Sequence, residues 1–442
     1  MSAMFQATSV LLLKYMVDFV GLAAATAGLL IGASKIYDAV VDPMIGMLSD
    51  RTRSRWGRRR PYVLLGSVVS AASFWLLFSL PATLPEPAKV GVALVALIAN
   101  ATGYALFVIP YLAMPAEMTT SPKARTSLMG YRISATALGQ IVGSFVAPLI
   151  IAGAGGGLVG HHAMALFLTV VILALGALCF WLTKDAVQTT RVKAEHYTIV
   201  QQVRLAVGNK PFVVLMGVKA ANLFGVAILT ALTPFFFTKI LHASYVDLGY
   251  FFLIKAVALF ASQPAWVWLS HRVGKKNTFQ ISSLFYALCT LALLFGRPGT
   301  PFLDVMGLGL LTGFFSGGLL LIGQALLPDT IEHDFHRTGL RREGVFSGVY
   351  TTIEKGSFAA AAAVLGVVLS SSGYVQPVGH AQEPASALNA IRLCLFLPAI
   401  FQAISSLILV WYRIDAGDGG RIASLADPEE LDGGVILPAA AR

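Results

Sequence analysis

Two aspartates, Asp38 and Asp42, lie in an apolar stretch that is long enough to cross a bilayer. An ionised carboxylate in such a stretch costs about 2.5 to 3.5 kcal/mol. Residues four apart on a helix project from the same face, so the two side chains lie one above the other. Two carboxylates this close in a medium of low dielectric constant share a proton or hold a cation between them. The spacing therefore predicts a cation site, which is a metal site if the cation is Na+.

A structural interpretation competes with the cation site, because each aspartate could pair with a buried cation such as Lys35 or Arg132. Arg132 lies about two turns inside the fifth apolar stretch, where it needs a buried partner or an acceptor group of a substrate. Asp38 or Asp42 is its candidate partner. The residues alone leave both interpretations open.

Other charged residues also lie in apolar stretches. Lys219 is one, and Glu354 and Lys355 are adjacent in the middle of the eleventh stretch. Since adjacent residues project about 100° apart on a helix, only one of these two can face the interior squarely. Lys14 and Asp18 are four apart near the end of the first stretch, where an intrahelical ion pair at the membrane surface explains them.

The composition indicates that membrane-spanning helices hold these residues in place. Hydrophobic residues make up 56% of the 442 residues and charged residues only 12%, whereas soluble domains carry about 25% charged residues. Apolar stretches long enough to span the hydrocarbon core recur throughout the chain. We predict an all-α membrane protein with spans at about 4–21, 24–48, 62–81, 89–112, 128–152, 163–183, 211–236, 246–270, 277–296, 302–327, 344–371 and 389–412.

The basic residues lie mainly between the spans and predict the orientation. The loops after the even-numbered spans, up to the tenth, hold 19 lysines and arginines. The positive-inside rule places these loops and both termini in the cytoplasm, which predicts a multi-pass protein of the cytoplasmic (inner) membrane. The net charge of +10 is thus not a sign of nucleic-acid binding.

We expect no disulfide and no removable signal peptide, because the three cysteines lie in apolar stretches and the N-terminus lacks the signal pattern.

A repeat relates the two halves of the chain. Ser49-Asp50-Arg51 recurs as Ser270-His271-Arg272 after 221 residues, and the same shift places Pro43 on Pro264. We expect two six-span halves, 1–183 and 211–412, joined by a cytoplasmic linker at 184–210 and followed by a tail at 413–442. Such halves are typical of transporters that expose a central site alternately to each side of the membrane.

A cluster of arginines follows the second span. Asp50 precedes six arginines within ten positions, and charge-assisted hydrogen bonds from these to carboxylates on other helices could close the cytoplasmic side. In the alternative interpretation the arginines only fix the orientation. The predicted cytoplasmic gate consists of Asp50, Arg51, Arg58, Glu117, Arg341 and Glu343.

At these motifs the chain resembles the glycoside-pentoside-hexuronide:cation symporters, a branch of the major facilitator superfamily that includes the melibiose permease. The resemblance covers about residues 15 to 412. It rests on Lys35-Ile36-Tyr37-Asp38-Ala39, Asp42-Pro43, Arg53-Ser54-Arg55-Trp56-Gly57-Arg58, Ile109-Pro110-Tyr111, Asn209-Lys210-Pro211-Phe212 and Lys355-Gly356.

The resemblance implies a major facilitator fold, with twelve helices in two pseudo-symmetric six-helix bundles, and symport of a sugar, glycoside or related solute with H+ or Na+. It implies that Asp38 and Asp42 hold the cation, that Arg132 lies near the substrate and that Lys355 faces the same cavity. Tyr37 and Tyr104 are the further residues expected at the substrate site. We expect no cofactor beyond the coupling ion, no partner beyond the solute and membrane lipid, and a monomer.

Three positions depart from the family pattern. Val108 replaces an aspartate that binds sugar, Ala105 replaces a threonine of the cation site, and Val41 replaces an asparagine. Sodium prefers several oxygen ligands, so the last two changes favour protons or weak coupling, and the first argues against a galactoside held in the same manner. The first span begins part-way through the family's first helix, so the acid there that contacts sugar has no counterpart.

Two other functions fit the residues. A transporter of an amphipathic, lysolipid-like solute would suit a more apolar pocket. A membrane enzyme could use Asp38 and Asp42 as acid and base on a lipid-linked substrate, although no loop carries a recognisable metal-binding or donor-binding motif.

Overall fold

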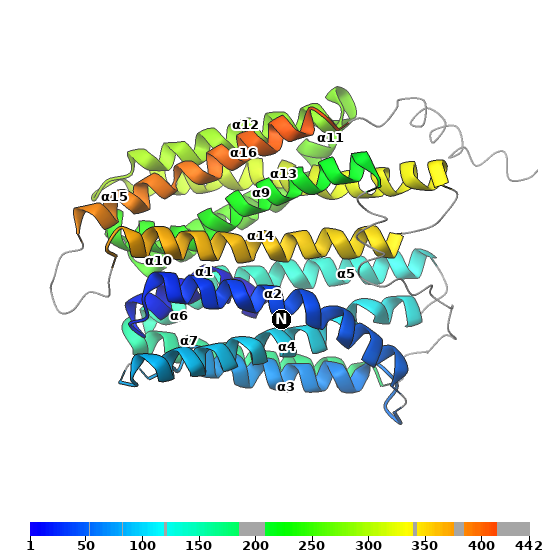
Figure 1. Ribbon diagram of the computed structural model, residues 1–442, viewed down its shortest axis with the longest axis horizontal. Helices are drawn as coiled ribbons and strands as arrows, with labels where there is room; N and C mark the ends of the chain where they lie inside the picture. Colours follow the sequence, from blue (N-terminus) through cyan, green and yellow to red (C-terminus); the bar gives the residue numbers. More distant parts are fainter. Residues whose placement is uncertain are drawn as a thin grey trace, which may run out of the picture.

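Long helices that run along one direction of the molecule make up the fold (Figure 1). The computed structural model describes residues 1–52, 54–81, 83–118, 122–184, 208–338, 343–374 and 384–412. Within these ranges the chain contains no strand, which confirms the predicted all-α class. Most of the expected linker and the expected tail lie outside the described residues.

The first half of the chain supplies the helices drawn in blue and cyan, and the second half those drawn in green to orange (Figure 1). The first group comprises α1 (Ser2–Asp18), α2 (Ala24–Arg51), α3 (Arg60–Leu77), α4 (Glu86–Met118), α5 (Pro122–Ile141), η1 (Val142–Val146), α6 (Ala147–Gly153) and α7 (Gly157–Leu182). The second group comprises α9 (Lys210–Phe235), η2 (Phe236–Ile240), α10 (Tyr245–Ala261), α11 (Gln263–Val273), α12 (Lys275–Ala292), η3 (Leu293–Phe295), α13 (Phe302–Thr338), α14 (Glu343–Ser371), α15 (Ala385–Cys394) and α16 (Phe396–Leu409).

The helices match the predicted spans in order. Among the described residues, ten are long and apolar enough to cross a membrane, and an eleventh results if α10 and α11 form one bent span. The first predicted span corresponds to α1, whose 17 residues extend for about 26 Å at the usual helical rise. The prediction of a multi-span helical protein is therefore confirmed.

Two helices continue past the ends of their predicted spans. The span predicted at about 302–327 continues as α13 through the polar segment from Asp329 to Asp334, as far as Thr338. Its carboxylates are paired there: Lys275 binds Asp329 at 2.6 Å and the side chain of Asn209 donates to Asp334 at 3.2 Å. A helix satisfies its own backbone, so it can project beyond the apolar layer where its side chains have partners. Likewise, the span predicted at about 89–112 continues past Pro110 as one helix, α4, to Met118.

The two copies of the repeat differ at their proline. α2 continues through Pro43, whereas the chain bends by 45° between α10 and α11, just before Pro264. Gln263, which corresponds to Asp42, donates to the backbone carbonyls of Leu259 and Gly317. The second copy thus uses this position to hold helices together.

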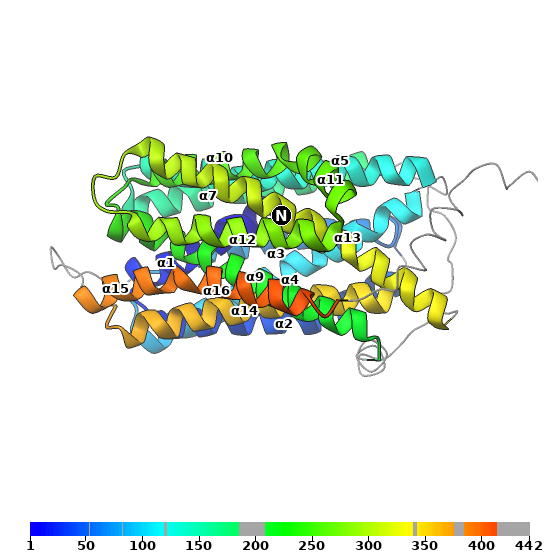
Figure 2. The same cartoon turned by 90° about the horizontal axis from the view of Figure 1, so that it is seen from above.

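The halves meet where α2 lies beside α14 (Figures 1 and 2). Small residues allow this close approach, since a Cβ added at Gly28 would lie 2.5 Å from the carbonyl oxygen of Ala362, and one at Gly366 would lie 2.4 Å from that of Ala24. Small residues commonly let membrane helices pack this tightly. The contact lies at the end of the bundle where α1 ends and α2 begins, here called the Asp18 end.

Candidate functional site

The predicted pair of aspartates lies on α2 where this helix faces the second half. Asp38 is 2% exposed, and Lys35, one turn earlier, lies 3.4 Å from its Oδ2 atom. The Oδ2 atom of Asp42 forms an ion pair with Lys355 of α14. One aspartate is therefore paired within its own helix and the other across the interface between the halves.

Each aspartate also has an oxygen without a partner. The Oδ1 atoms of Asp38 and Asp42 are both buried, and neither makes a hydrogen bond within the described part of the chain. Buried polar atoms are nearly always hydrogen-bonded. These two oxygens are therefore positioned to receive a proton or to ligate a cation, while the two lysines balance the negative charge.

Arg132 does not pair with either aspartate, contrary to the predicted partnership. Its Nε atom is buried and has no hydrogen-bond partner in the described chain, and the aspartates are bound by lysines instead. Lys35 and Lys355 reach them from one helical turn away and from the facing helix, whereas Arg132 lies on α5. The side chain of Arg132 is itself partly buried on α5.

Each of the two predicted tyrosines contacts a residue of another helix. The hydroxyl group of Tyr37 lies 3.0 Å from that of Thr102, which joins α2 to α4. Tyr104 contacts Phe5 of α1, with 5.9 Å between ring centroids, and the same Phe5 ring lies 5.9 Å from that of Phe358 on α14.

Phe5 connects these aromatic and charged groups, yet sequence reasoning missed it. The amine of Lys35 lies 5.1 Å from the centre of its ring. A phenylalanine in an apolar stretch is usually an ordinary core residue, and only the contacts of its ring with Tyr104 of α4 and Phe358 of α14 reveal its position. The sequence therefore contains no feature that identifies Phe5 as a residue of the site.

A second ion pair lies next to the first. Lys219 of α9 is 7% exposed and bonds to Oε2 of Glu354 at 2.8 Å, and its amine lies 2.9 Å above the ring of Tyr350. Glu354 and Lys355 thus pair with different helices, α9 and α2, as their 100° separation on α14 requires. Two neighbouring ion pairs therefore connect α9 to α14 and α14 to α2.

The pair formed by Lys14 and Asp18 is confirmed, and it has further partners. Lys239 of η2 lies 3.9 Å from Asp18, and the hydroxyl group of Tyr374, which follows α14, donates to Asp18 at 2.8 Å. The expected intrahelical pair therefore also joins the first half to the second at the Asp18 end.

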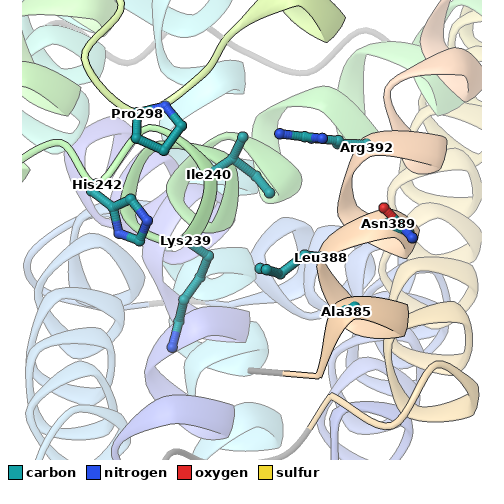
Figure 3. Close-up of a pocket in the computed structure, with 8 residues that line it drawn as sticks. All are labelled: Lys239, Ile240, His242, Pro298, Ala385, Leu388, Asn389 and Arg392. Atoms are coloured by element: carbon teal, nitrogen blue, oxygen red, sulfur yellow. The ribbon is translucent and has the colours of Figure 1, made fainter. Parts of the chain in front are cut away.

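A pocket of about 180 Å³ lies beside this network (Figure 3), and neither Asp38 nor Asp42 is among the residues that line it. Its basic lining groups are Lys239, His242 and Arg392, and all of its lining residues belong to the second half. The pocket therefore does not coincide with the predicted cation site.

The predicted gate lies largely outside the described residues. This holds for Arg341 and for the side chains of Asp50, Arg51, Glu117 and Glu343. Arg58 is partly buried and has an interaction partner. Its neighbour Arg60 donates to the carbonyl oxygen of Phe180 at 2.5 Å, so part of the arginine cluster holds α3 to α7 within the first half.

Comparisons with known proteins agree with this architecture. A family model described as MFS/sugar transport protein matches residues 1–416. The chain is 28% identical to the isoprimeverose transporter of Lactiplantibacillus pentosus, covering 95% of this chain and 88% of that protein. It is 26% identical to the putative glycoside/cation symporter YagG of Escherichia coli strain K12, with coverage of 93% and 88%.

Solved structures share the fold at low sequence identity. The nucleoside transporter NupG superposes with a TM-score of 0.65 at 14% identity, covering 92% of this chain and 95% of that one. A bacterial homologue of the human lysosomal transporter Spinster gives 0.70 at 14% identity, with coverage of 92% and 93%.

Proposed function

Because this chain belongs to the MFS/sugar transport protein family, it is a membrane transporter, and we propose that it carries a sugar, glycoside or related solute together with a cation by alternating access. The named relatives support a sugar-like solute, since one is an isoprimeverose transporter and another a putative glycoside/cation symporter. A lysolipid-like solute and an enzymatic activity have no comparable support.

The ion pair between Asp42 and Lys355 is the observation that carries the mechanism. A cation that binds at the unpartnered oxygens of Asp38 and Asp42 neutralises the charge that holds Lys355. The bridge between α2 and α14 then weakens, and the halves, 1–183 and 211–412, become free to move relative to one another. Cation binding and the movement of the halves are coupled through one contact.

The surroundings of the aspartates favour H+ as the coupling ion over Na+. Val41, Ile45 and Ala105 form a buried apolar cluster, and Val41 and Ala105 occupy positions where the family pattern has side chains with an oxygen ligand. A proton needs only one carboxylate oxygen.

The proposed orientation places both termini and the Arg58 loop in the cytoplasm and the Asp18 end outside, in the inner membrane. The distribution of lysines and arginines among the loops supports this orientation. The protein acts as a single chain, since both halves of the site come from one polypeptide.

Uptake into proteoliposomes tests the function. Isoprimeverose and a panel of other glycosides and pentoses are supplied with an inward proton gradient, an inward sodium gradient or neither. We expect one of the sugars to accumulate when the proton gradient is imposed. Accumulation that requires sodium would reverse the choice of ion, and lack of both uptake and counterflow for every sugar would refute the proposed function.

A further inference from the structure

Glu354 carries a carboxylate that is not part of the proposed cation site. Its Oε2 atom accepts from Lys219, and its Oε1 atom accepts no hydrogen bond from the residues that the structure describes. The two partners differ in exposure, since the side chain of Glu354 is 47% exposed and that of Lys219 only 7%. A glutamate that served only to neutralise a buried lysine would be buried with it.

Glu354 lies on a face of α14 that other helices of the bundle contact. Phe358 lies four residues later on the same face of α14 and contacts Phe5 of α1. Lys219 approaches this face from α9, and the Phe5 ring that Phe358 contacts also lies 5.9 Å from the ring of Tyr104 on α4. Groups from helices of both halves thus lie on the side of α14 that carries Glu354.

We propose that Glu354, held by Lys219, binds the hydroxyl groups of the transported sugar. This inference rests on the proposed function and specifies the substrate site. A carboxylate oxygen fixed by a lysine is a strong acceptor for the O–H groups of a neutral, polyhydroxylated solute. Lys219 fixes the glutamate rotamer through its hydrogen bond to Oε2, and its amine is itself held over the ring of Tyr350.

The position of Glu354 also links the sugar to the cation. Glu354 and Lys355 are adjacent on α14, and Lys355 pairs with Asp42 at the cation site. A sugar bound at Glu354 and a cation bound at Asp42 therefore act on neighbouring residues of one helix. This arrangement makes α14 the element through which the two ligands affect each other.

Competition by deoxy sugars tests the assignment. The probe is the sugar that the native protein carries in the panel beginning with isoprimeverose, and the competitors are its analogues that each lack one hydroxyl group. We expect one analogue to compete about tenfold or more weakly than the parent sugar in the native protein, because a hydrogen bond to a charged group is lost. In the double variant Lys219→Met/Glu354→Leu, that analogue and the parent should compete within about twofold of each other.

The double variant separates binding from a structural role. It replaces the ion pair with apolar side chains of similar size, an exchange that proteins often tolerate. Lys219→Met alone should keep the discrimination, because Glu354 remains. Thr352→Val is the matched control, since Thr352 lies two positions away, about 200° around α14.

The outcomes are distinct. Loss of discrimination in the double variant, with cation-dependent counterflow retained, supports the proposal. Discrimination equal to that of the native protein in the double variant would overturn it and leave Glu354 as a counter-ion of Lys219. If the native protein carried no sugar at all, the proposed function would be refuted, and the proposed sugar site would be refuted with it.

Discussion

Asp42 and Lys355 form the contact on which the proposed coupling depends, because they are opposite charges from different halves of the chain. An ion pair in such surroundings is costly to break by removal of one partner, since the other charge is then left alone. Protonation of the aspartate has the same effect on the lysine as removal of the charge. The pair is therefore sensitive to the ion that the transporter binds.

At the scale of single residues, we predict that Asp42→Asn abolishes concentrative uptake. The amide at position 42 cannot take up a proton or balance the charge of Lys355. Binding of the coupling ion therefore no longer controls the contact between α2 and α14. Accumulation should fall by about tenfold or more, which corresponds to at least 1.4 kcal/mol. The measurement is gradient-driven uptake in proteoliposomes.

Asp304→Asn is the control for that substitution, because it removes an exposed carboxylate at the start of α13. Its uptake should equal that of the native protein. Undiminished accumulation by Asp42→Asn would contradict the assignment of the cation site.

At the scale of elements, α2 carries both the cation site and the crossing with α14. The crossing requires glycine where the backbones touch, since a Cβ at Gly28 would lie 2.5 Å from the Ala362 carbonyl oxygen. The register of this crossing determines which residue of α14 lies opposite Asp42. Close packing at one end of α2 thus positions the charged residues about three to four turns further along the helix.

We predict that Gly28→Ala destabilises the protein by about 1 to 3 kcal/mol, because the added methyl group forces α2 and α14 apart. Gly91→Ala on α4 is the matched control, as a Cβ there meets nothing within 4 Å. Thermal unfolding in detergent measures both. Equal melting temperatures for the two variants would show that the crossing adjusts without cost.

At the scale of the whole molecule, the halves are joined at the Asp18 end by two kinds of contact. The crossing of α2 and α14 is apolar, whereas Asp18 receives Lys239 and Tyr374 from the second half. An alternating-access cycle must break both kinds of contact when that end opens. The charged cluster formed by Asp18, Lys239 and Tyr374 therefore affects the balance between the two states of the transporter.

We predict that Tyr374→Phe favours opening at the Asp18 end, because Asp18 loses a hydrogen bond that is made to a charged group. The ratio of open to closed states should rise by about tenfold. Distances between spin labels at cysteines replacing Thr83 and Ala385, in a protein without its native cysteines, measure the change.

The expected result is a larger population at long distances than in the labelled parent protein. The control is Tyr250→Phe, which also removes a tyrosine hydroxyl from the second half but leaves Asp18 untouched. A distance distribution identical to that of the parent would show that the hydrogen bond from Tyr374 to Asp18 does not help to close the Asp18 end.

The sequence alone determined the order of the helices, because a bilayer demands apolar stretches of a fixed minimum length and makes every charge within them conspicuous. It also placed Asp38 and Asp42 on one face of α2, since helical periodicity is local. The polar extension of α13 was not predictable in this way, because its carboxylates are paired by residues distant in sequence, such as Lys275 and Asn209.

Only the tertiary structure decided the partners of the charges. Lys355 rather than Arg132 meets Asp42, and Lys219 meets Glu354, because α14 lies between α2 and α9. Phe5 became part of the site in the same way, because its ring contacts Tyr104 of α4 and Phe358 of α14. Which side chains meet across helices depends on how the helices cross, and local periodicity does not contain that information.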